Sequence, residues 1–132
     1  MDHELDSITS RALAGDRAAA FELVSLVPES ARGAAKDSFS LLSASALDEM
    51  LREPAEFMSF KAPEMPAVVD PAVFRCAIDC SYRGNKGAVR EALSGLDLAQ
   101  LFTVVSTAKQ LCTQLEDIPL RSRIAIDVAT AS

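Results

Sequence analysis

The sequence lacks most of the side chains that catalysis and nucleotide binding require. It has one histidine, His3, so the usual general base is nearly absent. No Ser or Cys lies in a recognisable nucleophile motif, and the stretch GNKGAV lacks the Lys-Ser/Thr ending of a phosphate-binding loop. We therefore predict a non-catalytic protein, and the sequence names no catalytic residue and no cofactor.

Long apolar runs and a leader sequence are also missing. No stretch approaches the roughly 18 apolar residues of a membrane span, and the first residues, MDHELDSITSR, contain no apolar core of a signal peptide. Three cysteines are an odd number for a disulfide framework. These absences predict a cytoplasmic protein with free thiols that does not insert into a membrane.

Positive charge is scarce as well. The chain carries 13 Lys and Arg against 19 Asp and Glu, a formal net charge of −6. A nucleic-acid-binding protein normally has a basic patch that neutralises phosphates, and an anionic membrane surface attracts basic segments. The sequence has no run rich in Lys or Arg, which argues against direct binding to nucleic acid or to a membrane.

The residues that are present favour an all-α fold. Aromatic residues make up 5% of the 132 residues and Trp is absent, whereas 49% of the residues are hydrophobic. Ala and Leu, which have high helix propensity, supply much of this content, and apolar residues recur at the i, i+3, i+4 spacing of helices. We predict one domain of six to eight helices, in a bundle or a short α-solenoid-like stack with a Pro-rich connection in the middle.

Four prolines in the middle of the sequence divide this domain into two helical halves. Pro54, Pro63, Pro66 and Pro71 exclude a continuous helix and separate residues 1–53 from residues 72–132, with 54–71 as an acidic connection. In the first half we expect a helix at 3–14, a second one capped by Asp16 after Gly15, and a long segment at 29–53. A break at Ser43-Ala44-Ser45 is favoured there, because Ser45 and Asp48 resemble a capping box.

The second half contains three further helix-start signals: Asp70-Pro71, Gly84-Asn85, and Asp97 with Gln100. The first of these helices is expected to bury Phe74, Ala77, Ile78 and Tyr82. The last is expected to continue to about residue 116. Residues 120–130 fit either a helix or a strand, and we favour a helix because no partner strand is evident.

A weak internal similarity relates the two halves at a spacing of 69 residues. It aligns residues 12–27 with residues 81–96, and each segment has the pattern helix, Gly-(Asp/Asn)-basic turn, helix. Gly15, Asp16, Arg17, Ala19, Glu22 and Ser25 fall opposite Gly84, Asn85, Lys86, Ala88, Glu91 and Ser94. This pattern suggests two related helical units stacked as in an α-solenoid.

The most distinctive candidate for a functional site is the acidic segment 45–70. It contains six acids and two bases, a net charge of −4, interleaved with Met and Phe. Acidic groups around soft apolar side chains suit a protein partner with a basic surface. The alternative is that Phe57 and Phe60 belong to the core while the acids are merely solvated. The predicted partner-binding residues are Asp48, Glu49, Glu53, Glu56, Phe57, Met58, Phe60, Glu64 and Met65.

Two other groups of residues have simpler explanations. Cys76 and Cys80 are spaced to share a helix face, and with Cys112 they supply three possible metal ligands; packing as small apolar residues is favoured over a metal site. The basic residues of 75–90 would favour an anion at a helix start, although solvated charges are the expected explanation. These basic residues are Arg75, Arg83, Lys86 and Arg90.

The function predicted from these features is a non-catalytic protein-binding module. Its most concrete form is a small acidic inhibitor, such as an immunity protein or antitoxin, that covers a basic partner surface. An adaptor, a chaperone or a phage-encoded anti-defence protein would share the same features. The main alternative is a cysteine-based metal or redox sensing domain.

Overall fold

The computed structural model describes the backbone of residues 2–131 and the side chains of residues 4–116. Within this part of the chain it is all-α, as predicted, with seven α-helices, one short 3-10 helix and no strand. In chain order these are α1 (Asp2–Leu13), α2 (Arg17–Ser25), η1 (Glu29–Ala31), α3 (Arg32–Met50), α4 (Pro54–Ser59), α5 (Pro71–Tyr82), α6 (Lys86–Leu93) and α7 (Leu98–Ala131).

The helices begin where the capping residues predicted. The Asp16 carboxylate accepts hydrogen bonds from the backbone N–H groups of Ala18 and Ala19, at 2.9 and 3.2 Å. Asp70 and Asn85 cap α5 and α6 in the same way. Before α7, Asp97 and Gln100 each accept from the other's backbone N–H, at 2.9 and 3.0 Å. These side chains satisfy amides that have no partner inside a helix, which explains why local sequence fixes these ends.

Two predictions about helix interiors were wrong. The expected break at Ser43–Ser45 is absent, because α3 runs without interruption through Met50 and both serines are buried inside the bundle. Packing of this helix outweighs the local capping signal. Tyr82 is not part of the buried face of α5: its ring is exposed and its hydroxyl donates to the Ala31 carbonyl at 3.3 Å. The helix favoured at 120–130 is confirmed, since α7 continues to Ala131.

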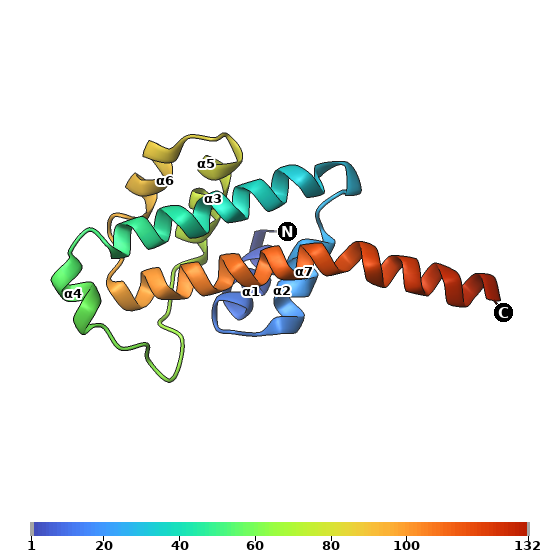
Figure 1. Ribbon diagram of the computed structural model, residues 1–132, viewed down its shortest axis with the longest axis horizontal. Helices are drawn as coiled ribbons and strands as arrows, with labels where there is room; N and C mark the ends of the chain where they lie inside the picture. The colour runs from blue at the N-terminus through green and yellow to red at the C-terminus, as the bar shows by residue number, and fades with distance from the viewer. Residues whose placement is uncertain (1, 132) are drawn as a thin grey trace.

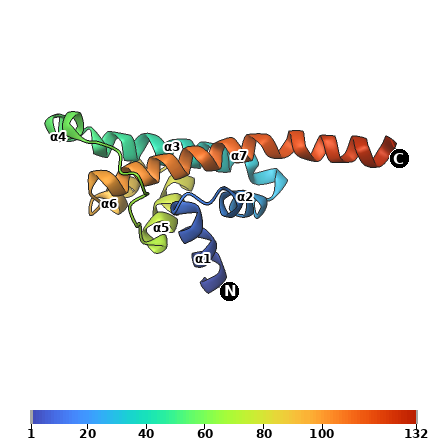
Figure 2. The same cartoon turned by 90° about the horizontal axis from the view of Figure 1, so that it is seen from below.

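The helices form two layers. Helices α3 and α7 lie side by side and antiparallel in one layer, and α1, α2, α5 and α6 form the layer beneath them (Figures 1 and 2). Helices α5 and α6 pack against α3, and α2 packs against α7, whereas α1 packs mainly against α2 and has smaller contacts with α5 and α7. The core between the layers consists mostly of Ala, Leu and Val, and Leu42 of α3 and Leu111 of α7 are both completely buried.

The internal similarity is a structural repeat. Gly15 and Gly84 both have positive φ, 98° and 71°, as glycine readily does at the end of a helix. The Gly15 N–H bonds to the Ala12 carbonyl and the Gly84 N–H to the Ser81 carbonyl, each at 3.0 Å. Each of these residues has its counterpart 69 positions later. The turn between α1 and α2 therefore recurs between α5 and α6.

The repeat extends through a third helix in each unit. At the same spacing α3 corresponds to the first part of α7, and the buried positions of the two units match. The matching buried pairs are Ala20 and Val89, Val24 and Leu93, Ala35 and Val104, Leu42 and Leu111, and Ala46 and Leu115. We call the two three-helix sets the first unit (α1, α2, α3) and the second unit (α5, α6, α7).

The two units interleave instead of stacking one after the other. The two third helices, α3 and α7, pack most extensively on each other, and each also packs on the helix pair of the other unit, α3 on α5 and α6, and α7 on α2 and, to a smaller extent, α1. An ion pair between Asp6 of α1 and Arg75 of α5 also joins equivalent positions of the two units. The fold is thus a bundle with approximate internal two-fold symmetry, and not a solenoid-like stack.

Candidate partner-binding surface

The acidic segment lies at one end of the bundle, where α3 ends, α4 lies and α7 begins (Figures 1 and 2). Pro54 occupies the first turn of α4, where its missing N–H costs no hydrogen bond. After Ser59 the chain is non-helical up to α5 and is held at its far end. There Val69 is buried, and the Gln100 side chain donates to the Val68 carbonyl at 3.1 Å.

Phe57 and Phe60 hold the near end of this segment against the bundle. Both rings are half-buried and pack against the core. The ring centroids of Phe60 and Phe102 of α7 lie 5.8 Å apart, with the planes tilted by 54°, a favourable geometry for an aromatic pair. For these two residues the geometry supports the alternative stated above, in which they belong to the packed structure.

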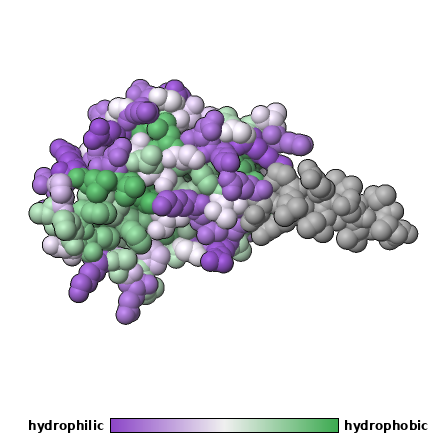
Figure 3. Space-filling model, in the orientation of Figure 1, coloured by the Kyte–Doolittle hydropathy of each residue, from purple (hydrophilic) through white to green (hydrophobic). Residues whose placement is uncertain are grey.

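Several large apolar side chains of the acidic segment and of the neighbouring ends of α3 and α7 are exposed. Met58 is 85% exposed and Met65 is 79% exposed, and further exposed apolar residues come from α3 and α7. Figure 3 shows hydrophobic residues at the surface of this end of the molecule. We call the following set the apolar patch: Leu47, Leu51, Met58, Met65 and Phe102.

Three members of the patch were missed by sequence reasoning. Leu47, Leu51 and Phe102 were not among the predicted partner-binding residues. For Leu47 a signal was present, because a large apolar residue stands directly beside the periodic position Ala46. That the three belong to one end of the molecule follows only from the antiparallel pairing of α3 with α7.

Four free carboxylates accompany the apolar patch. Asp48, Glu53, Glu56 and Glu64 are exposed, and none of them forms an ion pair with any residue whose side chain the structure describes. Uncompensated negative charge therefore lies close in sequence to the exposed methionines: Glu56 is on α4 with Met58, and Glu64 directly precedes Met65. We use "acidic surface" for these four residues together with the apolar patch.

Glu49 differs from the other predicted acids. Its side chain is only 8% exposed, and it pairs with Arg90 of α6 at 3.1 Å and with Arg52 at 3.7 Å. Two cations offset its charge, so it contributes little to the field at the acidic surface. Its contact with Arg90 ties the end of α3 to α6.

The basic residues of 75–90 are largely neutralised. Arg75 pairs with Asp6, Arg83 with Asp79, and Arg90 with Glu49. Lys86 alone has no ion pair within the described part of the chain. The arrangement gives little support to an anion-binding site at this turn.

The cysteines do not come together as metal ligands. All three are free thiols, and no group of three or more potential ligands occurs among the residues with described side chains. Burial, followed by the neighbouring Cys76, raises the pKa of the Cys80 thiol, and burial raises the pKa of the Cys112 thiol. A raised pKa lowers the thiolate fraction and with it the reactivity of these two groups.

Over the described residues, no helix combines the length and the apolar character that crossing a bilayer requires.

Known proteins offer no guide to this surface. Comparison of the chain with known protein families, curated proteins and solved structures finds no match.

Proposed function

We propose that the chain is a non-catalytic protein-binding module whose binding site is the acidic surface. The observation that carries this proposal is the exposure of Met58 and Met65 in a segment that also carries four exposed carboxylates without ion pairs. The partner that fits this chemistry presents an apolar site surrounded by Lys and Arg.

The two kinds of side chain have different tasks in such a complex. Methionine is flexible and polarisable, so it adapts to an apolar partner pocket and contributes most once it is desolvated. The carboxylates lie in water in the free protein and attract a basic partner over a distance, which speeds encounter more than it slows release. Phe57 and Phe60 support the surface from below instead of contacting the partner.

The most concrete form of the proposal is a stoichiometric inhibitor, such as an immunity protein or antitoxin. An acidic surface suits this role because it can cover the basic cleft of an enzyme that acts on phosphates. An adaptor, a chaperone or a phage-encoded anti-defence protein would use the same surface chemistry. The identity of the captured partner separates these roles.

The experiment begins with capture from lysate of the native host, using immobilised wild-type protein and two charge variants. The variant Glu53→Lys/Glu56→Lys reverses two charges of the acidic surface. The control Glu29→Lys/Glu91→Lys makes the same change in charge at exposed residues without ion pairs elsewhere. We expect a partner that the wild type and the control capture and the surface variant loses. Equal capture by all three proteins would refute the proposed site.

Binding kinetics with the purified partner then separate steering from anchoring. The charge variant should lower the association rate and reduce its dependence on salt. Replacing Met58 and Met65 with Ala should instead raise the dissociation rate with little change in stability, because both side chains are already exposed. Leu26→Ala is the matched control, since Leu26 is 63% exposed but lies at the end of α2. Methionine variants that dissociate like this control would remove the apolar patch from the interface.

A further inference from the structure

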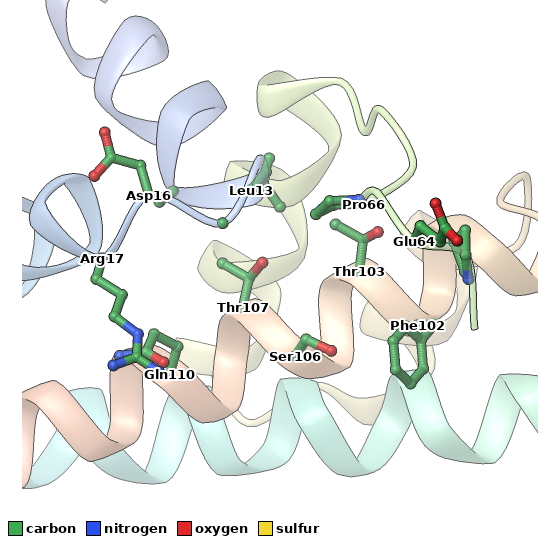
Figure 4. A pocket seen from close by; sticks show the side chains of 13 residues that line it. Leu13, Asp16, Arg17, Glu64, Pro66, Phe102, Thr103, Ser106, Thr107 and Gln110 are labelled. Atoms are coloured by element: carbon green, nitrogen blue, oxygen red, sulfur yellow. The ribbon is translucent and has the colours of Figure 1, made fainter.

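A pocket of about 210 Å³ opens on the other side of α7 from α3, between α7, the turn from α1 to α2, and residues 63–66 (Figure 4). This volume is about seven times that of one water molecule in the liquid, enough for a molecule with a single ring. Leu13 and Pro66 line one side of it. The opposite side is α7, with Phe102 and the Thr and Ser hydroxyls (Figure 4).

Thr107 provides an unused polar group in this pocket. The residue is 5% exposed, and its hydroxyl has no hydrogen-bond partner in the described part of the chain. Other buried threonines bond to their own helix: Thr9 donates to the Leu5 carbonyl at 2.8 Å and Thr103 to the Ala99 carbonyl at 3.2 Å. Because no protein group uses this hydroxyl and the residue lines the pocket, the hydroxyl can donate to or accept from a ligand bound there.

Arg17 provides an unused positive charge. It lines the pocket and forms no ion pair with any residue whose side chain the structure describes. The neighbouring Asp16 carboxylate is already bound to the first amides of α2, and Figure 4 shows it directed away from α7. Glu64 lies at the opposite end of the pocket from Arg17 (Figure 4). The end formed by Arg17 therefore favours an anion.

The equivalent place in the repeat, between α3 and the turn from α5 to α6, has the same framework without these free groups. The counterpart of Thr107 is Ser38, whose hydroxyl lies 2.6 Å from that of Ser81. The counterpart of Leu13 is Tyr82, whose hydroxyl bonds to the Ala31 carbonyl. At one of the two equivalent positions the hydroxyl of Ser38 is hydrogen-bonded within the protein. At the other, the hydroxyl of Thr107 lines the pocket without a protein partner.

We propose that this pocket binds a small amphipathic carboxylate. The carboxylate pairs with Arg17, Thr107 hydrogen-bonds to the ligand, and an apolar ring or short chain lies against Leu13, Pro66 and Phe102. The proposal does not depend on the proposed partner-binding function, although Glu64 and Phe102 belong to both the pocket and the acidic surface.

Benzoate and its neutral analogue benzamide are suitable probes, titrated up to about 20 mM and followed by chemical shifts in NMR spectra of the labelled protein. We expect benzoate to shift the signals of Gly15, Thr103 and Thr107 at lower concentration than benzamide does. The variant Arg17→Gln should abolish this preference. Lys86→Gln, the same kind of change at the equivalent position of the second unit, should keep it.

Two further variants test the body of the pocket. Thr107→Val, which keeps the shape of the side chain, should weaken benzoate binding by about three- to tenfold through the lost hydrogen bond. Ser106→Phe places a ring at the pocket from an exposed position and should block benzoate binding. It therefore tests the pocket even if Thr107→Val folds poorly. No binding of benzoate, shifts scattered over the surface, or an unchanged preference in Arg17→Gln would each overturn the proposal.

Discussion

The buried hydroxyl pair between α3 and α5 offers a direct measure of how the two units hold each other. Ser38 and Ser81 are almost completely buried, and their Oγ atoms lie 2.6 Å apart. Ser81 also donates to the Ile78 carbonyl at 2.7 Å, whereas Ser38 is 3.3 Å from that carbonyl. The two hydroxyls therefore share one acceptor and depend on each other for their hydrogen bonds.

Single alanine substitutions should be unequal in effect. Ser38→Ala leaves Ser81 bonded to Ile78, so the free energy of unfolding should fall by only about 1 kcal/mol. Ser81→Ala removes the closest partner of Ser38 and leaves a long bond, which raises the expected loss to about 1–2 kcal/mol. In the double variant no buried hydroxyl remains unpaired, and the loss should be smaller than the sum of the single losses by about 1 kcal/mol.

The assay is urea unfolding followed by circular dichroism at 222 nm, with all four proteins of the cycle compared at constant m-value. Ser10→Ala is the control, because Ser10 is exposed on α1 and its loss should change the unfolding free energy by no more than about 0.5 kcal/mol. Strictly additive single effects would show that the two hydroxyls do not interact. A double variant less stable than the sum would refute the shared-acceptor argument.

Two further predictions concern the turns and the connection between the units. Gly15→Ala and Gly84→Ala should each lower the unfolding free energy by about 1–2 kcal/mol, because both glycines have positive φ. Gly33→Ala is the control and should not lower it, because Gly33 lies in the first turn of α3 with open space around it. Thermal melting of the three variants checks this prediction, and equal effects would contradict it. Cleavage at a protease site inserted between Lys61 and Ala62 should leave two fragments that elute together in gel filtration, because each third helix packs on the other unit; separate elution would refute the interleaved packing.

Helix ends could be predicted from the sequence because their cause is local. Asp16 and Asn85 each bond to amides two or three residues away, so the interaction is visible as a short pattern. The interior of α3 is different. Ser43 and Ser45 carry the same kind of signal, yet packing of α3 in the bundle decides their conformation. A pattern within ten residues contains no information about that packing.

On the acidic surface, too, features with a local cause could be predicted from the sequence and long-range contacts could not. The exposure of Asp48, Glu53, Glu56 and Glu64 agrees with their polarity alone. The pairing of Glu49 with Arg90 could not be foreseen, because the two residues are 41 positions apart and belong to different units. Likewise, the packing of Phe60 depends on Phe102, which belongs to a different helix far along the chain. Their role in binding remains a prediction.

The exchange of third helices has a consequence for the growing chain on the ribosome. When α3 has been made, its apolar side chains Leu42 and Ala46 lack α7, the helix that lies beside it in the finished protein. About 65 more residues must be added before Leu115 appears, which takes about 3–13 s at 5–20 residues per second. During that time the first unit has no completed core. We therefore expect the first unit to complete its folding only after α7 has been made, and chaperones that recognise exposed apolar segments to have their main opportunity before that point.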